Sequence, residues 1–321
     1  MVPSLSRPSS TVGSVSESSR PRSLRIATAL GVLLALIAYV VVQYVTGGKG
    51  APRCTVGSGN NTYRFTPEQA ANAATISAVG TTRGMPERAV TIALATALQE
   101  SALRNIRHGD RDSVGLFQQR PSQGWGTPEQ ILDPVFSASR FYERLAEVPG
   151  YSRLPLTVAA QRVQRSGYPQ AYAKHEPDAA LLAAALTGRS AASLTCTSGI
   201  GVRKAGDPAK VRAELVRSFG ADVLPRGGAP AAGAAPRELA LPVAAAVESA
   251  GPEGGGAGGA SQRGWELAQW AVAQADALGL AEVSYAGRVW SAERSAEGWR
   301  TDESGEPGRA RAGEVRIRVA Q

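Results

Sequence analysis

Cysteine, histidine and methionine are nearly absent from this 321-residue sequence, which has two residues of each. A protein zinc site usually takes three or four Cys and His side chains at short spacing. Cys54, His108, His175 and Cys196 do not form such a motif. The sequence therefore excludes a zinc site of the usual spacing.

Acidic residues are outnumbered, since 27 Asp and Glu stand against 35 Lys and Arg and leave a net charge of +8. This charge favours polyanionic neighbours, namely nucleic acid, anionic lipid head groups or an acidic cell-wall polymer. The 36 Gly and 20 Pro are concentrated in a few segments. We therefore expect about two domains, with much of the chain serving as linker.

The N-terminal segment predicts a membrane anchor. Residues 1–23 are rich in Ser, Pro and Arg and have no apolar periodicity, so they are expected to be a disordered cytoplasmic tail. An uncharged 20-residue run follows, which is long enough as a helix to cross about 30 Å of hydrocarbon. Arginines directly before it place the N-terminus in the cytoplasm. We expect a single transmembrane helix over 24–46, held in the cytoplasmic membrane.

A cleaved signal peptide is the alternative, but its apolar region would be shorter and no Ala-x-Ala site follows the run. With an uncleaved signal-anchor, the rest of the chain lies outside the membrane, which makes a nucleic-acid partner unlikely. There, Cys54 and Cys196 are free to form a disulfide. Two unpaired buried thiols are the alternative.

Helix-start signals dominate the region after a short flexible tether at 47–61. Thr66-Pro67 begins a helix that is expected to stop at Gly80, and Pro86 begins a second helix. Its apolar residues recur at a spacing of three and four, so one face should be buried. Further helices are expected to start at 127 and 133 and to cover 156–163 and 177–186. Residues 62–200 should therefore form a mainly α-helical domain.

Three further parts complete the chain. Residues 201–219 read as a basic helical extension, and 220–264 as an Ala/Gly/Pro-rich linker. Residues 265–321 combine a helical pattern with two strand patterns, at 283–290 and 314–319. This indicates a small C-terminal α/β module, which is marginal in size to fold alone.

Glu100 stands at the end of the buried stripe of the second helix. Acid catalysis of glycoside cleavage needs a protonated carboxyl, and burial against apolar surface raises a carboxyl pKa. Asp110 or Asp112 could supply a second carboxylate, or could cap the turn before Gly115. For Glu100 itself, the alternatives are solvent exposure or an ion pair with Arg104.

The surrounding residues resemble the signature of the lysozyme-like lytic transglycosylases. In that family Glu-Ser-x-x-Asn, with a Glu that ends a core helix, is followed by Gly-Leu-x-Gln in the cleft. Here Glu100-Ser101 is followed by Asn105, one residue later than the pattern, and then by Gly-Leu-Phe-Gln at 115–118. The longer run at 115–126 is similar to actinobacterial membrane-anchored cell-wall relatives.

The resemblance covers about residues 62–190 and includes 161–168, at the place of the family's Ala-Tyr-Asn segment, although this sequence has no Tyr-Asn pair there. It implies a lysozyme-like fold and binding of peptidoglycan glycan strands. The substrate-binding residues that it implies are Ser101, Asn105, Ser113, Gly115, Leu116, Phe117, Gln118, Gln119, Trp125, Gln161 and Tyr168.

The implied reaction is cleavage of the MurNAc–GlcNAc β-1,4 bond, with Glu100 as general acid and then base. Attack by the MurNAc 6-hydroxyl would leave a 1,6-anhydro end, and neither metal nor cofactor is needed. A water positioned by Asp110 or Asp112 would make the enzyme a muramidase instead. The rival class is a non-catalytic wall-binding or scaffold protein. The sequence does not indicate which proteins of the cell-wall or division machinery could be partners.

Overall fold

Ten α-helices and two antiparallel sheets occur among the residues that the computed structural model describes, which are 22–46, 51–166, 169–198, 204–224, 237–243, 261–303 and 313–321. The chain divides into two units, residues 1–50 and residues 51–321. The tail predicted for 1–23 lies almost wholly outside the described residues, as do most of the linker predicted for 220–264 and Tyr168. The expectation of a mainly α-helical fold with a sheet-bearing C-terminal part is confirmed.

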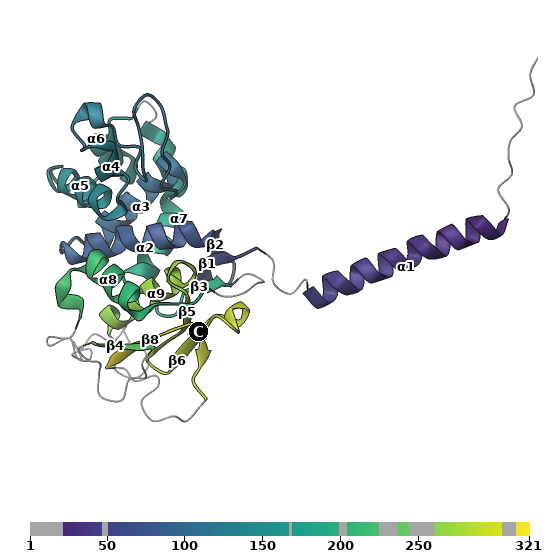
Figure 1. Ribbon diagram of the computed structural model, residues 1–321. Coiled ribbons are helices and arrows are strands. Elements are labelled where there is room, and N and C mark those ends of the chain that lie inside the picture. The colour runs from purple at the N-terminus through teal and green to yellow at the C-terminus, as the bar shows by residue number, and fades with distance from the viewer. Residues whose placement is uncertain are drawn as a thin grey trace, which may run out of the picture. The chain divides into compact units, whose positions relative to one another are not determined.

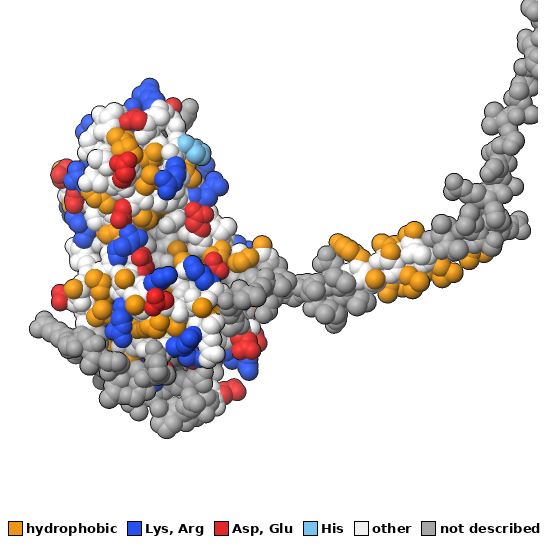
Figure 2. All heavy atoms as spheres, viewed as in Figure 1, with side chains coloured by type: hydrophobic (Ala, Val, Ile, Leu, Met, Phe, Trp, Pro, Cys, Tyr) orange, Lys and Arg blue, Asp and Glu red, His pale blue; other side chains and the backbone are white. Residues whose placement is uncertain are grey.

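The first unit contains helix α1, Arg22–Thr46. Its described side chains, at 26 and 29–40, are exposed and mostly apolar (Figure 2). Among the described residues, no helix meets the length and apolarity that a membrane crossing requires. The membrane anchor at 24–46 therefore stays a prediction.

Helices form most of the second unit between residues 67 and 186. The helix starts predicted at Thr66-Pro67, Pro86, 127 and 133 agree with the structure to within one residue, since the helices begin at 67, 87, 128 and 134. Thr66, Thr127 and Asp133 accept capping bonds from backbone N–H groups. The elements are α2 (Pro67–Thr82), α3 (Glu87–Ser101), η1 (Pro121–Gln123), α4 (Pro128–Ile131), α5 (Pro134–Ala146), η2 (Tyr151–Arg153), α6 (Leu156–Gln164), η3 (Pro169–His175) and α7 (Glu176–Leu186).

Helix α2 corrects one expectation, because it runs through Gly80 to Thr82 instead of stopping there. Gly80 is used for a close approach: a Cβ at this position would lie 2.6 Å from the Tyr142 hydroxyl of α5. That hydroxyl donates to the Ile76 carbonyl, also on α2.

Helix α2 lies between α3 and α5 on one side and the C-terminal elements on the other (Figure 1).

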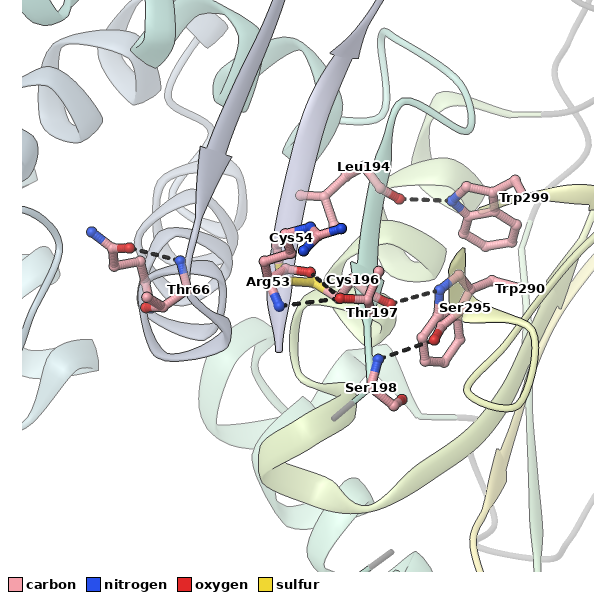
Figure 3. Close-up of a disulfide and its surroundings, with 11 residues drawn as sticks. Arg53, Cys54, Thr66, Leu194, Cys196, Thr197, Ser198, Trp290, Ser295 and Trp299 are labelled. Carbon is pink, nitrogen blue, oxygen red and sulfur yellow. Dashed lines mark hydrogen bonds between the residues drawn. A yellow bond between two sulfur atoms is a disulfide. The ribbon is translucent and has the colours of Figure 1, made fainter. Parts of the chain in front are cut away.

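A three-stranded sheet, in the order β2-β1-β3, covers one end of the helices. Its strands are β1 (Arg53–Ser58), β2 (Asn61–Phe65) and β3 (Leu194–Thr197). Cys54 faces Cys196 across β1 and β3, and the two form the expected disulfide (Figure 3). Part of the predicted tether is therefore a strand, because it pairs with residues more than 130 positions away.

A five-stranded antiparallel sheet, in the order β4-β8-β5-β6-β7, forms the C-terminal part. The single strand expected at 283–290 is a hairpin, which turns at Ala286 and Gly287, both with positive φ. β4 falls within the predicted linker and pairs with β8. The elements are α8 (Pro208–Phe219), η4 (Ala221–Val223), β4 (Glu238–Pro242), α9 (Gln262–Ala273), α10 (Ala275–Leu278), β5 (Leu280–Tyr285), β6 (Arg288–Ser291), η6 (Ser295–Glu297), β7 (Arg300–Thr301) and β8 (Glu314–Val319).

Hydrogen bonds join this C-terminal part to the helices and to the small sheet. The buried Gln269 side chain of α9 accepts from the backbone N–H of Ser193 and Leu194 and donates to the Ala185 carbonyl. Trp290 and Trp299 donate indole N–H bonds to carbonyls of β3 beside the disulfide (Figure 3). Residues 51–321 are therefore one packed unit.

Candidate active site

Glu100 occupies the second-last position of α3, where the helix leaves the core. Residues 89–98 of α3 are buried, whereas Glu100 is partly exposed. The helix ends on Ala102 in a left-handed conformation, and Leu103 after it also has a positive φ of 58°. The carboxyl is therefore attached to a rigid, buried segment and can still meet solvent.

Two neutral side chains hydrogen-bond the Glu100 carboxyl. Tyr172, fully buried in η3, donates its hydroxyl to Oε1 over 2.7 Å, and Gln164 of α6 provides a second bond. Burial raises the pKa of Glu100, and the two hydrogen bonds lower it by a smaller amount, so the net pKa is raised. Burial and the nearby carboxylate also raise the pKa of Tyr172 and keep it a hydrogen-bond donor.

The loop after α3 is fastened back onto the helix. The Ser101 hydroxyl donates to the Leu116 carbonyl over 2.7 Å, and Gln164 donates to the Phe117 carbonyl over the same distance. Gly115 has a φ of 79°, and a Cβ there would lie 2.8 Å from the Ile131 carbonyl oxygen. The predicted pair Glu-Ser and Gly-Leu-Phe-Gln is therefore brought together by these contacts.

Several side chains that are predicted to bind substrate are packed against, or hydrogen-bonded to, other parts of the protein. Phe117 is buried and stacks on Phe141, and Trp125 is 3% exposed beneath the guanidinium of Arg144. Phe117 is thus packed in the core, and the Arg144 guanidinium covers the ring of Trp125. Side-chain amides donate to backbone carbonyls in four cases: Asn105 to Leu132, Gln118 to His108 and Gly115, Gln119 to Ser137, and Gln161 to Ser166. Ser113 is buried within the same loop.

Neither candidate for the second carboxylate is held against Glu100 by a recorded contact. Asp112 accepts from the Ser122 N–H at 2.8 Å and from Arg120 at 2.7 Å, and the hydrogen bonds of the Ser122 side chain and backbone, followed by that of Arg120, lower its pKa. Asp110 is 94% exposed and makes a 4.0 Å ion pair with Arg111. Within the described part of the chain, no group of three or more His, Cys, Asp and Glu residues could hold a metal.

Tyr172 is the site residue that sequence reasoning missed. It lies 72 residues after Glu100 in a Tyr-Ala-Lys-His segment that carries no motif of its own. Gln99, which precedes Glu100, hydrogen-bonds His175 from the same segment at 3.2 Å. Only the packing of η3 against α3 brings this segment to the acid.

A separate hollow of about 800 Å³ lies over the outer face of the five-stranded sheet. Arg294, Arg300 and Arg318 line it together with acidic side chains that include Glu293 and Glu297. Arg318 pairs with Glu282 and Arg300 with Glu297, so much of this charge is neutralised internally. The hollow shares no residue with the surroundings of Glu100 described above.

One comparison with known families gives a match: residues 246–311 match a family model described as VldE, C-terminal domain. The matched stretch covers the end of the predicted linker, α9, α10 and strands β5 to β7, but not β4 or β8, and it does not include Glu100. No curated protein matches the chain.

Proposed function

We propose that this protein cleaves the MurNAc–GlcNAc β-1,4 bond of peptidoglycan strands, with Glu100 as general acid and then base. The observation that carries the proposal is the half-buried Glu100 carboxyl at the end of a rigid helix. Burial raises the pKa of this carboxyl. A carboxyl of this kind can be protonated at a pH where an ordinary glutamate is ionised. The resemblance of its flanking residues to lytic transglycosylases supplies the substrate class.

In the proposed reaction, Glu100 transfers its proton to the glycosidic oxygen as the bond from that oxygen to C1 of MurNAc breaks. The 6-hydroxyl of the same MurNAc then attacks C1 and gives its proton to the Glu100 carboxylate. The products are a 1,6-anhydro end and a free GlcNAc hydroxyl, and the acid is regenerated. The bond from the Tyr172 hydroxyl to Oε1 fixes the direction of the carboxyl during these steps.

The contacts of the two aspartates favour this lytic mechanism over hydrolysis. An inverting or retaining glycosidase uses a second carboxylate beside the acid. Asp112 is bound to Arg120 and Ser122, and Asp110 projects into solvent. Both contacts recorded for the Glu100 carboxyl come from the neutral Tyr172 and Gln164. An attacking hydroxyl supplied by the substrate fits such a site better than an activated water.

We also propose that residues 51–321 act outside the cytoplasmic membrane, anchored through residues 24–46. The Cys54–Cys196 disulfide supports this location, because disulfides persist in oxidising compartments and are rare in the cytosol. Among the described side chains of α1, nine large apolar ones are exposed, which is compatible with a lipid environment.

The test is digestion of purified peptidoglycan by the full chain, with product masses read by mass spectrometry. Glu100→Gln should abolish product, while Glu147→Gln, a matched change at an exposed glutamate, should not. Anhydro-ended products from the wild type support the lytic reaction. Reducing ends would show a muramidase. The absence of product from the wild type would remove the enzyme proposal.

A wall-binding role is the second candidate, and the charged hollow on the C-terminal sheet is the observation that favours it. Its mixed arginines and carboxylates could contact a polymer that carries both charges. Binding of the full chain to sacculi, unchanged in Glu100→Gln and weakened in Arg294→Ala, would support this role. Unchanged binding in Arg294→Ala would argue against the hollow as the binding surface.

A further inference from the structure

The turn directly after α3 has an unusual backbone. Ala102 and Leu103 are consecutive residues with φ of 53° and 58°, in the left-handed region that residues with a Cβ rarely occupy. Neither is glycine, so the conformation must be held by its surroundings. Glu100 lies two residues before this turn, and the direction of its carboxyl therefore depends on how firmly the turn is held.

Helix α2 holds this turn through two side-chain amides. Gln69 donates to the Ala102 carbonyl and Asn72 donates to the Leu103 carbonyl, each over 2.8 Å. Residues three apart on a helix share one face, so the two amides meet two successive carbonyls of the turn. The Ala102 and Leu103 carbonyls lie just beyond the last residue of α3 and outside its hydrogen-bond ladder, and these two bonds give each of them a partner.

The same turn is fixed from within α3 as well. The N–H of Leu103 bonds the Ala97 carbonyl, and the Leu103 side chain is fully buried. These contacts fix the inner side of the turn, while the amides of α2 fix its two carbonyls. Without the amides, the carbonyls could turn toward water and the segment could relax to a more common backbone conformation.

We propose that Gln69 and Asn72 are positioning residues that hold the Glu100 carboxyl in its reactive direction. This inference rests on the proposed glycosidase function for its kinetic consequence. Asn72 gives the cleaner test, because Gln69 also accepts from the Thr66 N–H in the capping box of α2. A small displacement of a catalytic group from its reactive position can cost a hundredfold in rate.

The experiment compares Asn72→Ala with Gln262→Ala in the full chain. Gln262 also donates an amide bond to a backbone carbonyl, that of Thr187, but does not touch the turn. Asn72→Asp, which keeps the size and removes the donor, is the second test variant. The readouts are kcat, KM, the thermal unfolding midpoint, and the pKa of Glu100 by NMR with ¹³C-labelled glutamate, assigned against Glu100→Gln.

Both Asn72 variants should lose at least tenfold in kcat, with KM within twofold of the wild type and an unfolding midpoint close to that of Gln262→Ala. The pKa of Glu100 should move down toward the ordinary range, because a freed carboxyl meets more water. The alkaline limb of kcat against pH should move down with it, since a general acid must be protonated.

Wild-type kcat and an unchanged Glu100 pKa in the Asn72 variants would overturn the positioning role. So would a loss of kcat that merely follows a drop in the unfolding midpoint. If the wild type itself forms no product, the glycosidase proposal fails instead. The NMR titration then still decides the positioning role, because it needs no turnover.

Discussion

The hydroxyl of Tyr172 donates a 2.7 Å hydrogen bond to Oε1 of Glu100 across 72 positions of sequence. A bond to the carboxylate stabilises the anion, so it opposes the effect of burial on the Glu100 pKa. The tyrosine therefore has two effects on the acid: it fixes the direction of the carboxyl, and it limits how far the pKa rises. These effects can be separated by experiment.

Tyr172→Phe should raise the Glu100 pKa further, because it removes a stabilising bond from the anion and keeps the apolar ring. The alkaline limb of the pH–rate profile should move to higher pH, and kcat should fall about tenfold as the carboxyl loses its anchor. The measurement is kcat against pH for peptidoglycan digestion. Tyr151→Phe, at a partly buried tyrosine outside the contacts of Glu100, is the control. A profile identical to the wild type would show that the bond has no role in the reaction.

Reduction of the disulfide should destabilise the second unit. Cys54 and Cys196 are 142 positions apart, and loop-closure entropy assigns such a bridge about 4–5 kcal/mol, although measured values are often smaller. Cys54→Ser combined with Cys196→Ser should lower the denaturant midpoint without changing the number of transitions. Unfolding of the wild type with and without reductant is the parallel measurement. Equal midpoints would mean that the strand pairing alone holds β1 to β3.

Some of this architecture follows from sequence, because its signals are local. The caps at Thr66 and Asp133, the buried stripe of α3 and the position of Glu100 at its end depend on spacings of a few residues. The pairing of Cys54 with Cys196 also follows from sequence, because two cysteines offer only one intramolecular bridge.

Other features could not be predicted, because their cause lies far away in the chain. Gly80 reads as a helix stop, yet it is needed inside α2 for the approach of Tyr142. β4 lies in an Ala/Gly/Pro-rich stretch, and its partner β8 begins more than 70 residues later. Trp125 is predicted to bind substrate, and sequence does not show that the Arg144 guanidinium lies 3.5 Å from the centre of its ring. In each case a tertiary partner decides the role of the residue.

Hydrogen bonds between α9 and residues 185–194 connect the C-terminal part to the helices, so we expect the second unit to unfold cooperatively. Gln269 is fully buried and satisfies two N–H groups and two carbonyls of residues 185–194. Gln269→Ala would leave these groups without partners, at about 1–3 kcal/mol for each one that water does not reach. We expect the free energy of unfolding to fall by about 3 kcal/mol or more, in a single transition.

Gln123→Ala, at an exposed glutamine, is the control for Gln269→Ala and should change the free energy of unfolding by less than about 0.5 kcal/mol. The measurement is urea unfolding followed by tryptophan fluorescence and by circular dichroism. Two separated transitions in the wild type would show that the sheet and the helices fold independently, against the packing described for α9.

Glu266 predicts a pH dependence of stability that is distinct from that of the active site. Its side chain on α9 is 6% exposed, contacts Arg263 at 2.7 Å and accepts from the Thr81 hydroxyl of α2. Burial raises its pKa, and the attraction of Arg263 and the bond from Thr81 offset only part of that rise. The folded state therefore holds this proton to a higher pH than the unfolded state does.

The sign follows from proton linkage. Where the folded state binds more protons, the free energy of unfolding falls as pH rises. For Glu266 the fall starts near its ordinary pKa of 4.5 and ends at the higher folded pKa. Glu266→Gln keeps the size and an oxygen acceptor for Thr81, so the variant should lose this part of the pH dependence and gain stability relative to the wild type as pH rises through that window. Urea unfolding at a series of pH values measures this difference in the free energy of unfolding, and Glu147→Gln is the exposed control. If the difference between variant and wild type is the same at every pH, Glu266 has the same pKa in the folded and unfolded states.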